Sequence, residues 1–208
     1  MPARRTVLLA LTAVAAAAAG SGRAWADTAA AAATAFIDKL LDDLAVVLNG
    51  SELQQNRRAR LASIVDSAVD AAAVARFCIG RFWPVATTEQ RRDYLELFHR
   101  VLLTSVTGRL GEYKGVTYAL GRTTPRDGDF VVSTIVTRPG DAPNNVDWLV
   151  SMASGSPKIV DLIAEGISLR MTQRSDYATY LARNNYDVQS LINAMRQQAK
   201  GVVFSENN

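Results

Sequence analysis

The sequence predicts an α+β fold, in which helices pack on a curved, roughly four-stranded antiparallel sheet and enclose an apolar cavity. In the first half of the chain, apolar residues recur at the three- and four-residue spacing of helices. Between residues 116 and 164 they alternate with period two, in runs separated by turn residues. The short connections between these runs favour antiparallel pairing, and helices on one side of such a sheet can surround a hollow when the sheet bends.

Residues 1–26 have the pattern of a cleaved signal peptide. Arg4 and Arg5 are followed by an apolar run of 13 residues, Val7–Ala19, which is too short to span a bilayer. Ala24-Trp25-Ala26 then supplies the small residues on either side of a larger one that typify a cleavage site. An N-terminal anchor that is never cleaved is the alternative interpretation.

The remaining residues, 27–208, have no net charge. The whole chain has 23 Lys and Arg residues against 20 Asp and Glu, and three of the arginines lie in the expected signal peptide. The pI of 9.2 therefore reflects the leader and does not indicate nucleic-acid binding. The remaining length is sufficient for one domain with a hydrophobic core. Cys78, the only cysteine, lies in an apolar stretch and is expected to be buried in that core.

Capping residues mark the first three expected helices. Residues 28–48 form the first, and Ser51, three residues before Gln54, predicts a capping box at the start of the second. Asp70 predicts the cap of a shorter helix that ends near Gly80.

The longest helix is expected to begin at Thr87, because Gln90 follows at capping-box spacing. Its apolar stripe is wide and includes Leu95, Phe98 and Leu102. The four expected strands then cover residues 116–120, 130–137, 146–153 and 159–164.

Two further helices are expected after the sheet. Gly166 predicts a bend at the end of the last strand, and Ser175 predicts the cap of a helix with Tyr177 on its inner side. Asp187 and Gly201 predict the start and the end of the final helix.

The sequence offers little support for catalysis or metal binding. His99 is the only histidine, and a single cysteine cannot form a cluster with zinc-ligand spacing. Nucleophile elbows, phosphate-binding loops and dinucleotide fingerprints do not occur in the sequence, so we expect no cofactor and no metal. A small periplasmic enzyme that uses the cavity remains an alternative, with Asp161 as its carboxylate. A structural ion pair between Asp161 and Arg174 is the preferred interpretation.

Several motifs resemble the MlaC, or toluene-tolerance, family of periplasmic lipid-binding proteins that serve an ABC transporter. The segment Glu165-Gly166-Ile167-Ser168-Leu169 after Asp161, and Arg174-Ser175-Asp176-Tyr177 beyond it, are similar to the family signature. The segments 66–83 and 87–92 are similar to the aromatic segment and the following helix start of the family. The resemblance extends over roughly residues 35–195.

The resemblance implies a single lipid-binding domain over residues 27–208 and a monomeric periplasmic carrier rather than an enzyme. Its expected partners are a phospholipid, an inner-membrane ABC transporter complex and an outer-membrane lipoprotein complex. A hopanoid ligand, as in one branch of the family, is an alternative. Pro157-Lys158 replaces the usual Trp-Lys, and Val106-Thr107 replaces a tyrosine, so we expect the cavity shape to differ.

Apolar side chains on the inner faces of the expected elements could line the cavity or fill the core, and the pattern is the same for both roles. The residues expected to bind lipid are Phe77, Phe82, Trp83, Leu95, Phe98, Leu102, Tyr118, Trp148 and Val150.

Overall fold

The computed structural model describes residues 12–110 and 114–200 and confirms the α+β class. Its antiparallel sheet has five strands in the order β1-β2-β3-β4-β5, so each strand pairs with its neighbours in the chain. The strands are β1 Thr117–Arg126, β2 Asp129–Thr137, β3 Asn144–Ser151, β4 Lys158–Ala164 and β5 Ile167–Ser168. The sequence pattern missed only β5, because two residues are too few to show a period.

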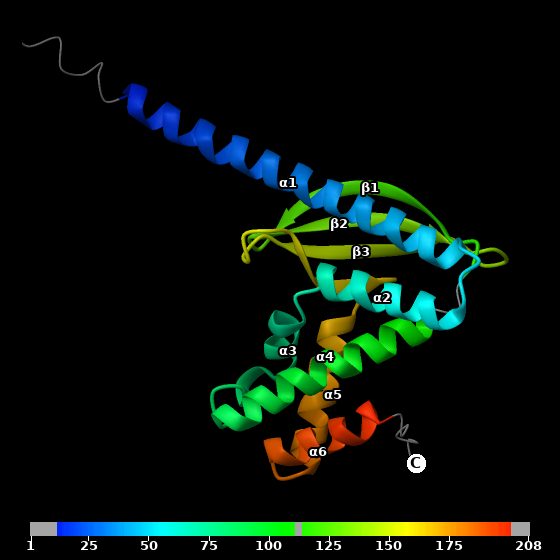
Figure 1. The fold of residues 1–208 in the computed structure, drawn as a ribbon. Helices are drawn as coiled ribbons and strands as arrows, with labels where there is room; N and C mark the ends of the chain where they lie inside the picture. The colour runs from blue at the N-terminus through cyan, green and yellow to red at the C-terminus, as the bar shows by residue number, and fades with distance from the viewer. Residues whose placement is uncertain (1–11, 111–113, 201–208) are drawn as a thin grey trace, which may run out of the picture.

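Helix α1 crosses one face of the sheet, and the later helices gather at one end of the molecule (Figure 1). Helix α2 follows α1 and lies between it and α4 (Figure 1). The helices are α1 Thr12–Asn49, α2 Gln54–Ala68, α3 Ala71–Ile79, α4 Thr88–Leu110, α5 Leu169–Arg183 and α6 Val188–Ala199, with a short 3₁₀ turn, η1, over Gly80–Phe82.

Three predicted helix starts are confirmed by their hydrogen bonds. The Asp70 carboxylate accepts from the Ala73 N–H at 2.9 Å. Thr87 and Gln90 bond each other's backbone N–H reciprocally, at 3.0 and 3.2 Å. Asp187 accepts from two N–H groups in the first turn of α6. The predicted stop at Gly201 lies outside the described residues.

Two predicted caps are wrong. Helix α2 begins after Leu53, whose side chain makes no capping bond, because residues 51–53 span the gap from α1 before the helix starts. Helix α5 begins at Leu169, one turn and a half before Ser175, because Ser168 caps it by accepting from the Met171 N–H at 3.1 Å.

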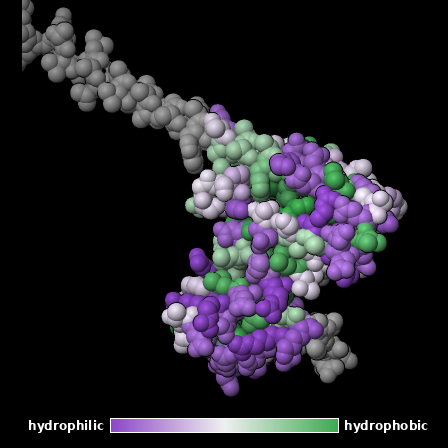
Figure 2. Space-filling model, viewed as in Figure 1, coloured by the Kyte–Doolittle hydropathy of each residue, from purple (hydrophilic) through white to green (hydrophobic). Residues whose placement is uncertain are grey.

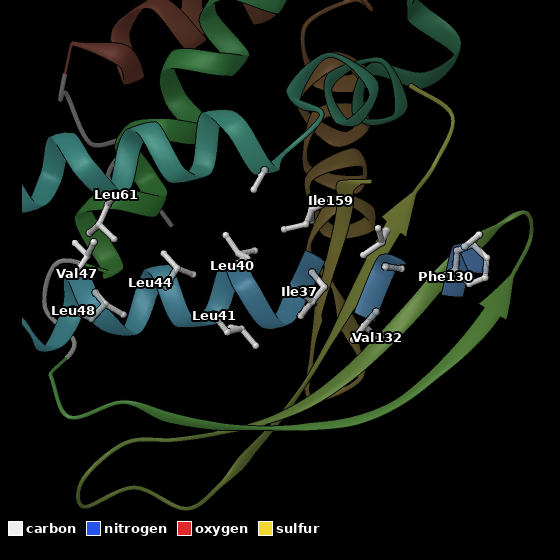
Figure 3. Packing of buried hydrophobic residues seen from close by; sticks show 14 residues of the cluster. Ile37, Leu40, Leu41, Leu44, Val47, Leu48, Leu61, Phe130, Val132 and Ile159 are labelled. Carbon is white, nitrogen blue, oxygen red and sulfur yellow. The ribbon is translucent and has the colours of Figure 1, made fainter. Parts of the chain in front are cut away.

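The buried side chains form two main clusters at opposite ends of the molecule. The upper core joins α1 and α2 to one face of the sheet (Figure 3). The lower core joins α3, α4, α5 and α6, with Tyr94 fully buried against Phe98 and Tyr177 at ring distances of 6.0 and 6.2 Å. A smaller cluster covers part of the other sheet face, where α3 packs. In the view of Figure 2, the surface over the helices of the lower core is mainly hydrophilic. Apolar residues are visible around α1.

Candidate functional site

Two apolar pockets border adjacent faces of α1. The sheet pocket, of about 340 Å³, lies between α1 and the strands; its lining includes Leu41, Leu48, Tyr118, Val136, Val146 and Ala164. The helix pocket, of about 230 Å³, lies between α1, α2, α4, the start of α5 and strands β3 and β4; its lining includes Leu40, Ile64, Ala68, Leu102, Val106 and Leu169.

The spacing of leucines on α1 explains why one helix lines both pockets. Leu40 and Leu44 point toward α2, whereas Leu41 points toward the sheet (Figure 3). Residues four apart lie on the same side of a helix, and the adjacent residue is rotated by about 100°. The run of leucines therefore gives α1 one apolar face toward α2 and a second toward the strands.

Three side chains border both pockets: Leu44, Trp148 and Leu162. Trp148 on β3 lies directly opposite Leu162 on β4. The Trp148 indole Nε1–H donates to Thr134 Oγ1 at 3.0 Å, and the Thr134 hydroxyl donates to the Val146 carbonyl at 2.9 Å. The orientation of the indole ring is therefore fixed by hydrogen bonds within the sheet.

Polar groups occur at the edges of the sheet pocket. Arg138, Asn144 and Glu165 come from the ends of β2 and β3 and from the β4–β5 turn. Tyr118 donates its hydroxyl to Asp42 Oδ1 at 2.7 Å, and this hydrogen bond to a carboxylate is the main reason that the pKa of Tyr118 is raised. The Tyr118 ring is thus held against α1 while its polar end stays outside the apolar volume.

Asp161 is buried at the wall of the helix pocket, and each of its carboxylate oxygens accepts a hydrogen bond. Ser168 Oγ donates to one oxygen at 2.5 Å and the Arg170 backbone N–H to the other at 3.0 Å. Arg170 Nε lies 3.5 Å from Asp161 Oδ2. The expected ion pair with Arg174 is therefore wrong. Because α5 begins early, Arg170 lies in its first turn beside β4, and Arg174 lies farther along and donates to the Phe77 carbonyl at 3.1 Å.

Three of the nine residues expected to bind lipid line the two pockets. Leu102 lines the helix pocket, Tyr118 the sheet pocket and Trp148 both. Leu95 borders a separate open hollow near His99. Val150 lies fully buried in the upper core.

The other four expected residues lie in or beside the lower core, away from both pockets. Phe82 and Phe98 are buried there. The Phe77 ring lies under the guanidinium groups of Arg170 and Arg174, at 4.3 and 5.0 Å from its centroid. The guanidinium groups of Arg76 and Arg91 lie 5.5 and 5.3 Å from the centroid of the Trp83 ring. These rings are held by cations and packing.

The sequence pattern contained the lining residues that the expected set lacks. Leu40 and Leu44 lie on the apolar face of the first expected helix, and Ile64 lies on that of the second. Leu162 alternates with its neighbours in the last predicted strand. Helical and strand periodicity therefore predicted that these side chains point inward. It did not predict which of the inward faces leave a space between them.

Cys78 and His99, the cysteine and the histidine of this chain, both have contacts that suit a structural role. Cys78 is 1% exposed, as expected for a packing residue, and burial raises the pKa of its thiol to about 12. The Nε2 atom of His99 lies 2.6 Å from Asp66 Oδ1 and links α4 to α2.

Within residues 12–110 and 114–200, no group of three or more His, Cys, Asp and Glu side chains could hold a metal ion. In the same part of the chain, none of the helices has both the length and the apolar character that a membrane span requires.

Comparison with known proteins gives a family and a fold. Residues 34–197 match the family model described as MlaC protein. A solved phospholipid-binding protein from Ralstonia solanacearum, determined in complex with a phospholipid, has a similar structure. The two chains are 23% identical and superpose with a TM-score of 0.71, over 81% of this chain and 97% of the other. At this level of identity, the likeness shows a shared fold.

Proposed function

This chain belongs to the MlaC family, and on that premise we propose that it is a periplasmic lipid-binding carrier with a phospholipid as its ligand. It would take phospholipid between an inner-membrane ABC transporter complex and an outer-membrane lipoprotein complex, acting as a monomer without a cofactor. The related Ralstonia solanacearum protein, which binds a phospholipid, supports the choice of ligand.

The observation behind this proposal is the pair of apolar pockets between the helices and the sheet. Their walls are mainly aliphatic and aromatic. The polar groups of the sheet pocket, including Arg138 and Glu165, come from strand ends and turns, and the charged residues of the helix pocket, Asp161 and Arg170, pair with each other. Ligand sites typically combine a large apolar surface with a few polar groups that fix orientation. Acyl chains fit the apolar walls, and a polar headgroup can remain at the edge.

A pocket of this kind can load and release a lipid without covalent chemistry. A two-chain phospholipid carries on the order of 30 methylenes, each worth about 0.8 kcal/mol on transfer out of water. The total exceeds the practical ceiling of roughly 18 to 21 kcal/mol for non-covalent affinity, so it does not measure binding strength. The relevant exchange is between pocket and bilayer. Because both are apolar, the two free energies nearly cancel.

The enzyme alternative requires Asp161 as its catalytic carboxylate, but this carboxylate is bound by neighbouring residues. Asp161 accepts two hydrogen bonds, from Ser168 and from the Arg170 backbone, and pairs with the Arg170 side chain. These contacts tie β4 to the start of α5. We therefore favour binding over catalysis.

The proposal includes export. Residues 1–26 would direct the chain to the periplasm and be removed after Ala26. The intact mass of the protein recovered from the periplasm would equal that of residues 27–208. Recovery of the uncleaved mass would instead support the anchor interpretation.

Tryptophan fluorescence tests whether acyl chains occupy the pockets. The proposed mature chain, residues 27–208, has two tryptophans, Trp83 and Trp148, and of these Trp148 lies at the pockets. In the Trp83→Phe variant, a phospholipid brominated along its acyl chains should quench the fluorescence of Trp148, because bromine quenches on contact. The Trp148→Phe variant, which retains Trp83, is the matched control and should not be quenched.

Quenching of both variants alike would place the lipid elsewhere on the molecule, and quenching of neither would reject the lipid site. Mass spectrometry of a solvent extract from the purified protein gives the ligand class. Acyl lipids support the phospholipid carrier, a pentacyclic lipid supports the hopanoid alternative, and an extract without lipid favours the enzyme.

A further inference from the structure

We propose that Trp148, together with Leu44 and Leu162, divides the lipid site into two compartments that each hold one acyl chain. The site then selects lipids with two flexible chains and excludes rigid fused-ring lipids such as hopanoids. This inference rests on the proposed function, and the experiments below distinguish the failure of one from the failure of the other.

The dividing wall is built from three separate elements. Trp148 and Leu162 are directly opposed neighbours on adjacent strands, and Leu44 comes from α1. All three side chains border the sheet pocket on one side and the helix pocket on the other. The two volumes therefore adjoin at these three side chains, which is where the proposed wall lies.

Part-buried hydrogen bonds hold the Trp148 side chain of the wall in place. Thr134 is 2% exposed and accepts from the Trp148 indole while donating to the Val146 carbonyl. Thr134 pairs with Val146, and Trp148 lies one pleat away on the same sheet face. Rotation of the indole away from the wall would leave its N–H without this partner, which is unfavourable in an apolar site.

The two compartments approach one another along a single hairpin. Glu165, at the β4–β5 turn, borders the sheet pocket, and Leu169 and Arg170, just after β5, border the helix pocket. Positive φ angles at Glu165 and Gly166, of 51° and 81°, form the tight turn that pairs Ala164 with Ile167 and Ile163 with Ser168. Two chains attached to neighbouring carbons of one glycerol could therefore diverge from this hairpin into separate compartments.

The same division disfavours a fused-ring lipid. The compartments measure about 340 and 230 Å³, and each alone is at or below the lower end of the range of about 300–1,000 Å³ typical of small-molecule sites. Flexible chains can bend around the wall and use both volumes. A pentacyclic ring system is one rigid body, so it can use both only if the indole is displaced.

Native mass spectrometry with a single-chain lysophospholipid tests the two compartments. The wild-type chain should bind two copies. Leu102→Trp fills the helix pocket and Val136→Trp fills the sheet pocket, so each variant should bind one copy and the double variant none. Val85→Trp, a matched change at a residue that is 71% exposed, should still bind two copies.

The outcomes of this experiment distinguish the partition into two compartments from lipid binding itself. Loss of both copies in each single variant would show one continuous cavity and overturn the partition, while leaving lipid binding intact. Failure of the wild-type chain to bind either lysophospholipid or diacyl phospholipid would overturn the proposed function itself. Circular dichroism on every variant identifies any that has lost its fold, and the smaller changes Leu102→Phe and Val136→Phe then replace it.

Substitution of Trp148 tests the exclusion of rigid lipids. Trp148→Ala should raise the affinity for a pentacyclic hopanoid at least about tenfold, a change readily resolved in a binding titration. Thr134→Val keeps the indole but removes its hydrogen bond, so it should produce a smaller gain. If the wild-type chain binds the hopanoid as tightly as a diacyl phospholipid, or if neither substitution changes hopanoid affinity, the partition does not set specificity.

Discussion

Asp161 connects three elements through one buried carboxylate. It lies on β4, accepts a hydrogen bond from Ser168 on β5 and is bound by the backbone and side chain of Arg170 on α5. Ser168 also caps α5, so the carboxylate orients the residue that starts the helix. The sequence alone suggested Arg174 as the partner. The choice between two arginines one turn apart depends on where the helix begins, and that is decided by this network.

Replacement of Asp161 by Asn should lower the free energy of unfolding by about 2–3 kcal/mol, because hydrogen bonds to a buried charge are lost and the nearby guanidinium loses its counter-ion. Denaturant unfolding measures the change. Asp43→Asn breaks an exposed pair with Lys39 and should cost no more than about 0.5 kcal/mol. Equal costs for the two substitutions would show that the network does not contribute to stability.

Cys78 should be nearly inert in the folded protein. Burial raises the pKa of its thiol to about 12, so at pH 8.5 the reactive thiolate is scarce. Alkylation by iodoacetamide should be at least about a hundredfold slower than in denaturant, where the pKa returns to about 8.5. Because the folded pKa is raised, this thiol stabilises the fold below about pH 8.5, and its contribution is lost as the pH rises toward about 12. Comparable labelling rates in the two states would contradict the burial.

At the scale of elements, the sequence predicted hydrogen bonds between residues close in the chain. It did not predict the distances between helices. The caps at Asp70, Thr87 and Asp187 followed from side chains that reach their own backbone. Ser51 has capping-box spacing to Gln54, but residues 51–53 form the non-helical connection from α1 and the helix starts only at Gln54. Capping-box spacing reports only on residues close together in the sequence. The length of the α1–α2 connection depends instead on where the two helices pack.

Gly80 illustrates an element boundary that only glycine can form. Its φ is +56°, and a Cβ there would lie 3.0 Å from the guanidinium of Arg174. Gly80→Ala should therefore destabilise the protein by about 1–2 kcal/mol, from backbone strain and from displacement of Arg174 off the end of α3. Thermal unfolding measures the effect.

Gly108 provides the opposite control. It lies within α4, and nothing lies within 4 Å of the position that a Cβ would occupy. Gly108→Ala should stabilise the protein by about 0.5–1 kcal/mol, because alanine loses less backbone entropy in a helix. Destabilisation by both substitutions would count against the assigned role of the Gly80 backbone.

At the scale of the whole molecule, α4 belongs to two regions with different packing. Its first half contributes Tyr94 and Phe98 to the lower core, where aromatic rings fill the interior. Its second half contributes Leu102 and Val106 to the helix pocket. Helical spacing placed all four on one apolar stripe, because a solid core and a hollow require the same residues. Which part of the stripe borders a space depends on how closely α1, α2 and β4 approach it, and periodicity does not encode that distance.

Lipid removal should therefore loosen one half of the molecule and not the other. A lipid in the two proposed compartments would contact α1, α2 and the sheet. A ligand that binds only the folded state stabilises it by mass action, by about 2.7 kcal/mol at a hundredfold excess over its dissociation constant. Without lipid, amide hydrogen exchange should accelerate in α2, in β3 and in α4 beyond Leu102, while the first half of α4, α5 and α6 keep their protection. The boundary should fall within α4 between Phe98, which is buried in the lower core, and Leu102, which packs against that core and lines the helix pocket. A uniform loss of protection along α4 would instead mean that the two cores open as one cooperative unit and that the lipid stabilises the entire fold.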